Sequence, residues 1–348
     1  MSEMVKRIGL IGYFGAEAYS DDLIEDVTKQ LLLEQRSDLV FDSTLLSKGQ
    51  ASCNIDYLNS FDLLIHCGGS LLGKCTHYPI RDIEQWVDKV HTPLAVFGIG
   101  YRFEPDKEPL TPEMHRRVTA LFDKSEVICV RGYKTIQHLE ENHLDTGKIC
   151  CVADPVTAHP VHPHGMGRVL VGNVRCMPDV EIQHNSTEKV YRLLAQCYDW
   201  LIDVYKLPLR LVSWRHNIDY DNDLTGANQV QRMMRYGSQV TIHTPANYRE
   251  AANMIDDAVF YFGQRLHPTV YAATQGIPFV GVEYQFDKML DWASTVGIDN
   301  VVHTGTDTLV EFIEAYSRVQ ENMTRLKETI PLKARELRLT AKRIVDLI

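Results

Sequence analysis

The chain of 348 residues carries 36 basic and 46 acidic side chains, has a formal net charge of −10, and is 45% hydrophobic and 24% charged. This composition is typical of a globular protein and excludes a disordered or collagen-like chain, and the length predicts two domains. The acidic balance argues against general binding to nucleic acid or anionic membranes, but it permits a local site for a small anion.

Three features predict a cytoplasmic protein. No stretch approaches the roughly 18 apolar residues that a membrane-spanning helix needs. The first 17 residues become polar too early for a secretory signal peptide. Eight cysteines are scattered along the chain without a Cys-x-x-Cys pair, so neither a disulfide framework nor a zinc knuckle is expected.

In the first half of the chain, short apolar runs alternate with amphipathic segments, which is typical of a parallel sheet covered by helices. Strands are expected at 7–12, 39–42, 61–67, 94–98, 127–130 and 149–152. Helices are expected at 21–34, 80–89, 111–124 and 134–142. The third helix opens with Thr111 at the cap position and Pro112 directly after it, a typical helix start.

Residues 155–168 are rich in proline and glycine, and no regular element is expected there. The alternation then restarts, with strands expected at 169–174, 209–214, 240–243, 259–263 and 278–282. Helices are expected at 187–205, 228–235, 247–256, 268–275 and 288–295. A long helical tail is expected over 306–348, with a break at Pro331.

The pattern predicts an α/β fold of two doubly wound Rossmann-like domains facing a cleft. The N-terminal domain is expected over 1–157, a linker over 158–168, and the C-terminal domain over 169–348 with its helical tail. Ligands of such sheets bind beyond the carboxyl ends of the strands. Functional residues are therefore expected directly after strands.

The first half offers candidates at several strand ends. The turn Gly68-Gly69-Ser70 follows the third strand, where backbone N–H groups can approach an anion, although a tight turn alone also needs glycine. Gly100 follows the fourth strand, and Arg131 follows the fifth. An arginine there can grip a carboxylate or phosphate with its planar fork of donors, or form a salt bridge at the rim.

The second half offers the sharpest segment, which runs from residue 261 to 278. Its strand ends at Gly263, and Arg265 and His267 follow in the first turn before a helix of small residues. A cation for an anionic group, with a histidine two residues later that can give or take a proton, is a plausible catalytic pair. Lys288 follows the next strand and is expected to line the same side of the site.

Other chemistries have little support in the sequence. His159, His162 and His164 lie in the proline-rich linker without the spacing or acidic partners of a catalytic metal site, so no metal is expected. The glycine spacing near residues 9–15 is not that of a dinucleotide-binding turn, and the motifs of hydrolase elbows, zinc proteases and P-loops are absent from the sequence.

Taken in order, these segments resemble the polysaccharide pyruvyl transferase family. Residues 15–22 loosely match its glycine-rich stretch before Asp-Glu, and residues 62–70 match its Asp-x-x-(Ile/Val)-x-x-Gly-Gly-(Ser/Gly). The Arg-Leu-His at 265–267, with the Ala-x-x-x-Gly-Ile-Pro that ends at Pro278, is the most specific match. The chain departs from the family pattern at Ser20, where the family has glycine, and at Gly132, where it has aspartate.

The resemblance implies transfer of a carboxyethylidene group from phosphoenolpyruvate to two hydroxyls of a sugar, giving a cyclic ketal and phosphate. It implies a fold like that of GT-B glycosyltransferases, no cofactor beyond the donor, and a carbohydrate acceptor. The sequence leaves the oligomeric state open, a homo-oligomer included. His267 is expected to act as the acid that protonates the donor's methylene carbon, and Asp21 to act on an acceptor hydroxyl. The expected substrate-binding residues are Arg131, Arg265, Leu266, Lys288, Gly68, Gly69, Ser70 and Gly100.

Two alternatives remain open at this point. A nucleotide-sugar glycosyltransferase on the same architecture would use a carboxylate of the C-terminal domain, such as Glu283, to hold a ribose. A non-catalytic relative that binds carbohydrates or anions is compatible with the departures at Ser20 and Gly132.

Overall fold

The structure is a computed structural model that describes residues 5–15, 18–43, 54–70, 72, 83–101, 109–162, 167–176, 186–216, 222–284 and 287–348. The chain divides into two compact units. Unit 1 comprises Met1–Ala16, Ile24–Ala158 and Pro331–Ile348, and unit 2 comprises Glu17–Leu23 and His159–Ile330. The expected domains differ from this division at two places, because the segment that carries Asp21 belongs to unit 2 and the C-terminal tail belongs to unit 1.

Unit 1 contains a six-stranded sheet in the order β2-β1-β3-β4-β5-β6. Every neighbouring pair in it is parallel. The strands are β1 (Lys6–Ile11), β2 (Leu39–Asp42), β3 (Leu63–Cys67), β4 (Leu94–Ile99), β5 (Ser125–Val130) and β6 (Ile149–Cys151). All residues of β3 and β4 are buried, as expected for strands covered on both faces.

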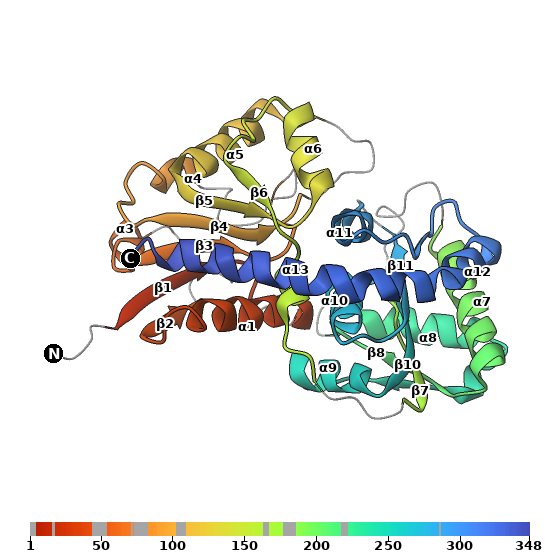
Figure 1. Ribbon diagram of the computed structural model, residues 1–348. Helices are drawn as coiled ribbons and strands as arrows, with labels where there is room; N and C mark the ends of the chain where they lie inside the picture. Colours follow the sequence, from red (N-terminus) through yellow and green to blue (C-terminus); the bar gives the residue numbers. More distant parts are fainter. Residues whose placement is uncertain are drawn as a thin grey trace. The chain divides into compact units, whose positions relative to one another are not determined.

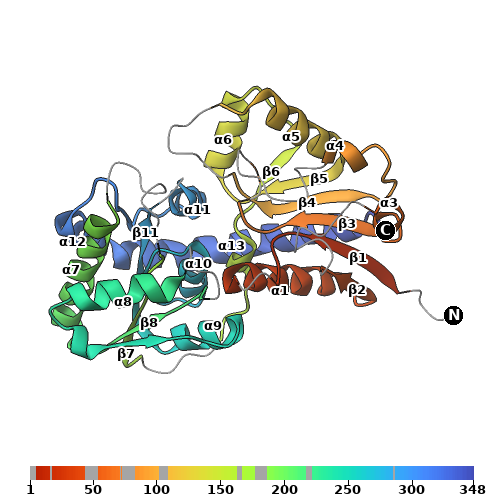
Figure 2. The same ribbon diagram turned by 180° about the vertical axis from the view of Figure 1, so that it is seen from behind.

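The helices of unit 1 cover both faces of its sheet. They are α1 (Tyr19–Leu33) from Ile24 onward, α3 (Ile55–Leu58), α4 (Ile83–Trp86), α5 (Pro112–Lys124), α6 (Tyr133–Glu141) and the end of α13 (Val319–Val345). Figures 1 and 2 show α1 and the end of α13 on one face, and α4, α5 and α6 on the other. The expected start of α5 is confirmed, since the Thr111 hydroxyl accepts the Met114 N–H at 3.2 Å.

Unit 2 contains a second six-stranded sheet, in the order β12-β11-β10-β7-β8-β9. Its pairs are also parallel. The strands are β7 (Val169–Asn173), β8 (Leu209–Val212), β9 (Val240–His243), β10 (Ala258–Gly263), β11 (Phe279–Glu283) and β12 (Val301–His303). The reversal of strand order at β7 makes this sheet doubly wound, so the predicted fold class is confirmed in both units.

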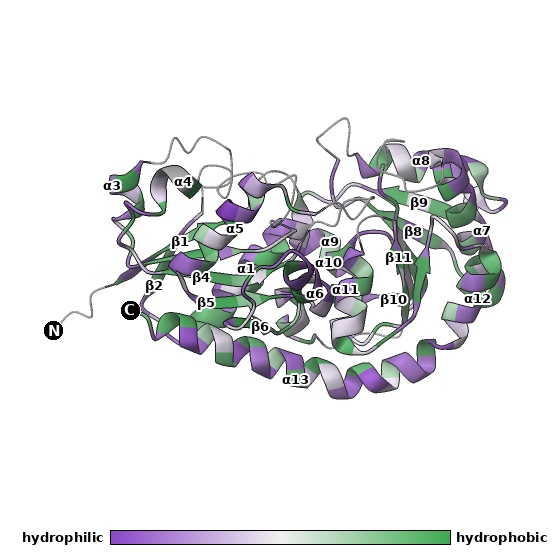
Figure 3. Ribbon diagram, turned by 90° about the horizontal axis from the view of Figure 1, so that it is seen from above, coloured by the Kyte–Doolittle hydropathy of each residue, from purple (hydrophilic) through white to green (hydrophobic). Residues whose placement is uncertain are grey.

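The helices of unit 2 follow its strands in the alternation that the sequence predicts. They are α7 (Thr187–Tyr205), α8 (Asp223–Met233), α9 (Tyr248–Asp256), α10 (Leu266–Thr274), α11 (Lys288–Val296), α12 (Leu309–Ser317) and the first part of α13. Figure 3 shows the strands mostly in the hydrophobic colour, whereas α13 alternates between hydrophilic and hydrophobic bands. The apolar core therefore lies in and around each sheet.

Several local predictions are wrong. The expected break at Pro331 does not occur, because α13 continues through it and the tail is interrupted at Arg318 instead. An interior proline costs a helix about 3 kcal/mol, and burial of the apolar side chains of Ile330 and Ala334 on either side offsets this cost. Residues 155–158, expected to be irregular, form a buried 3₁₀ turn, and the short β12 and α3 were not predicted.

The described cysteines are free thiols. Cys67, Cys129 and Cys197 are buried, and burial raises the pKa of each thiol above its usual value. These three are small core residues. Cys53 and Cys75 lie outside the described residues.

Candidate functional site

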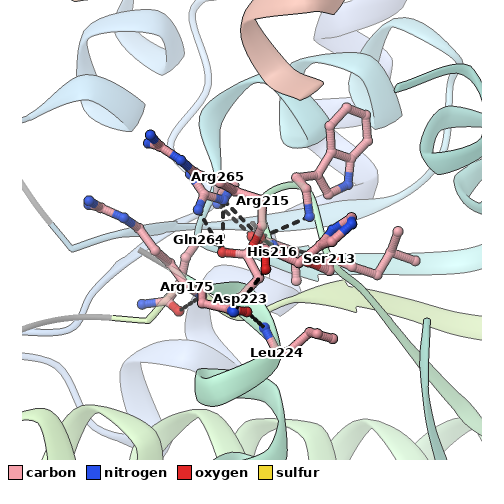
Figure 4. Close-up of polar contacts among 12 residues, drawn as sticks. Arg175, Ser213, Arg215, His216, Asp223, Leu224, Gln264 and Arg265 are labelled. Atoms are coloured by element: carbon pink, nitrogen blue, oxygen red, sulfur yellow. Dashed lines mark hydrogen bonds and ion pairs between the residues drawn. The ribbon is translucent and has the colours of Figure 1, made fainter. Parts of the chain in front are cut away.

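Three arginines follow three neighbouring strands of unit 2. Arg175 follows β7, Arg215 follows β8 and Arg265 follows β10, and the sheet order places these strands side by side as β10-β7-β8. The carboxyl ends of parallel strands meet at one edge of a sheet, so the three arginines lie at the same edge (Figure 4). Such a grouping favours binding of an anion.

Arg265 is held by a carboxylate that the sequence analysis did not single out. Its Nε lies 3.0 and 2.9 Å from the two carboxylate oxygens of Asp223, and its Nη2 lies 2.6 Å from Oδ1. Asp223 is the first residue of α8, and its side chain is 1% exposed. The contact is a charge-assisted, side-on pair that fixes the plane of the guanidinium (Figure 4).

Asn173, the last residue of β7, connects both partners of this pair. Its Oδ1 accepts the backbone N–H of Arg265 at 2.9 Å, while its Nδ2 donates to Asp223 Oδ2 at 3.0 Å. The backbone N–H of Trp214 donates to the same Asp223 oxygen at 2.9 Å. The buried carboxylate is thus satisfied by donors from three strand ends, as a buried charge requires.

Leu266 and His267 are the first two residues of α10, and both are buried. Arg265 is the cap residue, with extended backbone angles, and its carbonyl accepts the Thr269 hydroxyl at 2.9 Å. Every residue of α10 is buried, so the helix start has little freedom. The fold therefore holds His267 close to the end of β10.

Asp21 lies in the same unit, at the start of α1. The backbone N–H of Tyr19 donates to Trp214 O at 3.1 Å, and its hydroxyl donates to Pro245 O at 3.0 Å, which anchors this helix start to unit 2. Burial raises the pKa of the Asp21 carboxyl, and the nearby charge of His267, followed by that of Arg215, acts in the opposite direction. The structure thus brings Asp21, His267 and Arg265 into one electrostatic environment.

Lys288 is the first residue of α11 and is partly buried. The Glu283 carboxylate, at the end of β11, accepts the backbone N–H groups of Met289 at 2.7 Å and Leu290 at 3.3 Å. Glu283 therefore caps α11, a structural role that the sequence analysis did not predict.

The remaining predicted site residues lie in unit 1. Arg131, after β5, donates from Nη2 to the Ser70 hydroxyl at 2.6 Å and lies 3.4 Å from Asp154 Oδ2 through Nη1. A Cβ at Gly100 would overlap the guanidinium of Arg131, so that position must be glycine for the arginine to fit. Residues after β3, β4, β5 and β6 thus meet around one buried cation.

The turn after β3 has the backbone that its glycines predict. Gly68 and Gly69 have φ values of +79° and +69°, in the left-handed region that other residues rarely adopt. The carbonyl of Gly69 accepts the N–H of Gly100 at 2.9 Å, which joins the two glycine turns. In unit 1 the structure gathers Gly68, Gly69, Ser70, Gly100 and Arg131.

Among the described residues, no group of three or more His, Cys, Asp or Glu side chains is arranged to hold a metal ion. The rings of His159 and His162 lie 5.4 Å apart, and His164 lies outside the described residues. Within the same described part of the chain, no helix has the length and apolar character to cross a membrane.

Sequence reasoning missed Asp223, Asn173, Arg175 and Arg215. The signal for Asp223 was the pair Asn222-Asp223, because Asn222 caps α8 by accepting the Leu224 N–H at 3.0 Å. Helix α8 was expected to start five residues later, which hid the carboxylate. Arg175 and Arg215 each stand within three residues of a strand end, the rule that identified Arg265.

Comparisons with known proteins agree with this architecture. A family model described as polysaccharide pyruvyl transferase matches residues 21–285, and the chain belongs to this family. A sequence comparison with curated proteins finds no match. The family assignment supports a transferase.

Solved structures that are similar to this chain share its fold. Anabaena Alr3699/HepE in complex with UDP-glucose has a TM-score of 0.59 at 11% identity, with 98% of each chain covered. S. aureus MnaA solved with UDP has a TM-score of 0.58 at 12% identity, covering 99% of this chain and 98% of that one. UDP-GlcNAc 2-epimerase from Neisseria meningitidis, bound to UDP-GlcNAc, has a TM-score of 0.57 at 13% identity, with 98% of each chain covered. At these identities the likeness establishes the GT-B type of fold.

Proposed function

We propose that this chain transfers a carboxyethylidene group from phosphoenolpyruvate to two hydroxyls of one sugar in a polysaccharide or its precursor. The product is a cyclic ketal, and phosphate is released. The observation that carries the proposal is the grouping of Arg265, His267 and Asp21 at one edge of the unit 2 sheet. These groups match three tasks of the reaction: holding an anion, protonating a carbon and accepting a proton from a hydroxyl.

The donor carries a carboxylate and a phosphate, so its site needs several cations. Arg265 has its guanidinium plane fixed, Arg175 follows the adjacent strand β7, and Arg215 follows β8, the strand beyond it. Lys288 begins α11, which follows the next strand of the same sheet. Guanidinium groups bind carboxylates and phosphates through paired hydrogen bonds, which supports this edge as the donor site.

The chemistry starts at the methylene carbon of the donor. His267 gives a proton to this carbon, which becomes a methyl group and leaves the neighbouring carbon electrophilic. The first sugar hydroxyl adds to that carbon and loses its proton. The carbon–oxygen bond to phosphate then breaks, and the second hydroxyl adds and loses its proton. One hydroxyl proton restores His267, and the other leaves with the phosphate.

Asp21 serves the acceptor in this scheme. Burial raises the pKa of its carboxyl, so it holds a proton more readily than an ordinary aspartate. A group of this kind can take the proton of an attacking hydroxyl and pass it to the departing phosphate. The proximity to His267 and Arg215 supports a shared site for donor and acceptor.

The test uses phosphoenolpyruvate labelled with ¹³C at the carbon that becomes the ketal centre, together with a panel of sugars and polysaccharide precursors. The proposal predicts a ¹³C signal for a ketal carbon and an equal amount of released phosphate. Sugar transfer from a UDP-sugar without use of phosphoenolpyruvate would contradict it and favour a glycosyltransferase. Sugar binding without any turnover would contradict it in favour of a non-catalytic binding protein.

A further inference from the structure

Asp223 is a buried carboxylate outside the segments that carry the family resemblance. Its side chain is 1% exposed and accepts hydrogen bonds from Arg265, from the Asn173 amide and from the Trp214 backbone. Burying an ion pair brings little net stability, because desolvation of both charges offsets their attraction. The same burial is found for the Arg131–Asp154 pair of unit 1, so the role of Asp223 follows from what its geometry does to Arg265.

The geometry of the pair fixes the orientation of the Arg265 guanidinium. Asp223 engages Nε and Nη2, which form one edge of the planar guanidinium. The other N–H donors of a guanidinium point away from that edge in the same plane. The carboxylate therefore decides where the outer edge of Arg265 points.

Asn173 fixes the same arginine at its other end. Its Oδ1 accepts the Arg265 backbone N–H at 2.9 Å, and its Nδ2 holds Asp223 Oδ2 at 3.0 Å. Gly226 lets α8 approach closely, because a Cβ there would lie 2.8 Å from Arg175 O. Asn173 thus ties both the backbone of Arg265 and, through Asp223, its guanidinium to the end of β7, a central strand of the sheet.

We propose that Asp223, held by Asn173, is a positioning residue that aims the Arg265 guanidinium at an anionic group of phosphoenolpyruvate. This inference rests on the proposed function. Asp223 itself does not touch the donor; it acts through Arg265. Loss of the carboxylate leaves the positive charge in place but removes its orientation, so donor affinity falls more than the rate of the bound complex.

The expected result for Asp223→Asn is a KM for phosphoenolpyruvate raised by about tenfold or more, with kcat changed by less than about threefold. Asp223→Glu keeps the negative charge beside Arg265, so it avoids leaving a buried arginine unpaired, and it moves that charge by one methylene, which also raises KM. Asp256→Asn is the matched control, because Asp256 accepts the Tyr271 hydroxyl at 2.7 Å and precedes β10, at the opposite end of that strand.

A double-mutant cycle separates positioning from a structural role. The dissociation constant of phosphoenolpyruvate is measured by calorimetry for wild type, Asp223→Asn, Arg265→Met and the double variant, which removes both charges of the pair. We expect Asp223→Asn to weaken binding in the wild type and to have no further effect in the Arg265→Met background.

Two results overturn the inference alone: wild-type affinity in Asp223→Asn and Asp223→Glu, or an equal loss in both backgrounds of the cycle. Failure of the wild-type protein to bind phosphoenolpyruvate and to form a ketal overturns the proposed function, and the inference with it.

Discussion

The two units each hold an arginine against an aspartate at the carboxyl edge of a parallel sheet, but they hold it differently. In unit 1, Arg131 has a side chain that is 2% exposed, and it meets Asp154 at 3.4 Å. In unit 2, Arg265 has a side chain that is 10% exposed, and it meets Asp223 side-on at 2.6 to 3.0 Å. The first arginine is enclosed more completely, and the second is oriented more tightly.

The surroundings explain this difference. Arg131 is packed against Gly100 and bonded to Ser70 and Asp154, so it joins the loops that follow β3, β4, β5 and β6. Arg265 is fixed along one edge, and His267 follows it in the first turn of α10. Under the proposed function, we expect Arg131 to hold the unit 1 loops together and Arg265 to bind the donor.

The largest effect is expected at His267. His267→Gln removes the proposed acid but keeps a polar side chain of similar size, and we expect kcat for ketal formation to fall by roughly 10²- to 10⁴-fold. The rate of phosphate release, together with the ¹³C ketal signal from labelled phosphoenolpyruvate, measures this loss. His91→Gln, at an exposed position in unit 1, is the control. Unchanged kcat in a folded His267→Gln variant would remove His267 from the mechanism.

Asp154→Asn tests the role of the Arg131–Asp154 pair in unit 1. It leaves the buried Arg131 without its carboxylate, which typically costs about 3–5 kcal/mol of unfolding free energy. Chemical denaturation measures the loss. If Arg131 joins the loops, as we infer, the KM for phosphoenolpyruvate in the folded fraction stays at the wild-type value. A raised KM would assign Arg131 to the donor instead.

Gly100→Ala tests the same loops through packing. The added methyl group overlaps the Arg131 guanidinium and forces it to shift, at a cost of about 1–3 kcal/mol for overpacking. Gly147→Ala is the control, because a Cβ there meets only the Asp145 carboxylate, at 3.2 Å. Equal melting temperatures for the two variants would show that Gly100 does not make room for Arg131.

Asp21→Asn is expected to have the smallest effect on stability, and its sign depends on pH. Because burial raises the pKa of Asp21 in the folded state, the folded protein binds a proton more tightly than the unfolded chain. The free energy of unfolding therefore falls as pH rises from the unfolded-state pKa to the folded-state pKa of this carboxyl. Above the folded-state pKa, the ionised and buried carboxylate lowers the free energy of unfolding, and replacement by asparagine removes this destabilisation.

Thermal unfolding of Asp21→Asn checks this expectation. The melting temperature should exceed that of the wild type at neutral pH and match it below the ordinary aspartate pKa of about 3.9. Turnover should fall while stability rises. A lower melting temperature at neutral pH would mean that the ionised carboxyl is stabilising in the fold.

Much of the fold followed from the sequence, because apolar runs and helix caps are local signals. The bounds of β2 and β9 were predicted to the residue, and Arg265 and His267 stand directly after a strand as expected. The assignment of Asp21 to unit 2 was not predictable, since hydrogen bonds from Tyr19 to Trp214 and Pro245 decide it. Asp223 was missed because α8 starts five residues earlier than expected, and the strand order β10-β7-β8 then brings this carboxylate to Arg265.

The most direct test of the account is calorimetric titration of phosphoenolpyruvate, beside UDP-glucose, into wild type, Arg265→Ala and Arg210→Ala. Arg210 is the matched control, since it also pairs with an aspartate of unit 2, Asp257, at 2.7 Å. We predict saturable phosphoenolpyruvate binding by wild type and Arg210→Ala, and a loss of at least about tenfold in affinity in Arg265→Ala. Binding of UDP-glucose in place of phosphoenolpyruvate, or undiminished phosphoenolpyruvate binding by Arg265→Ala, would contradict it.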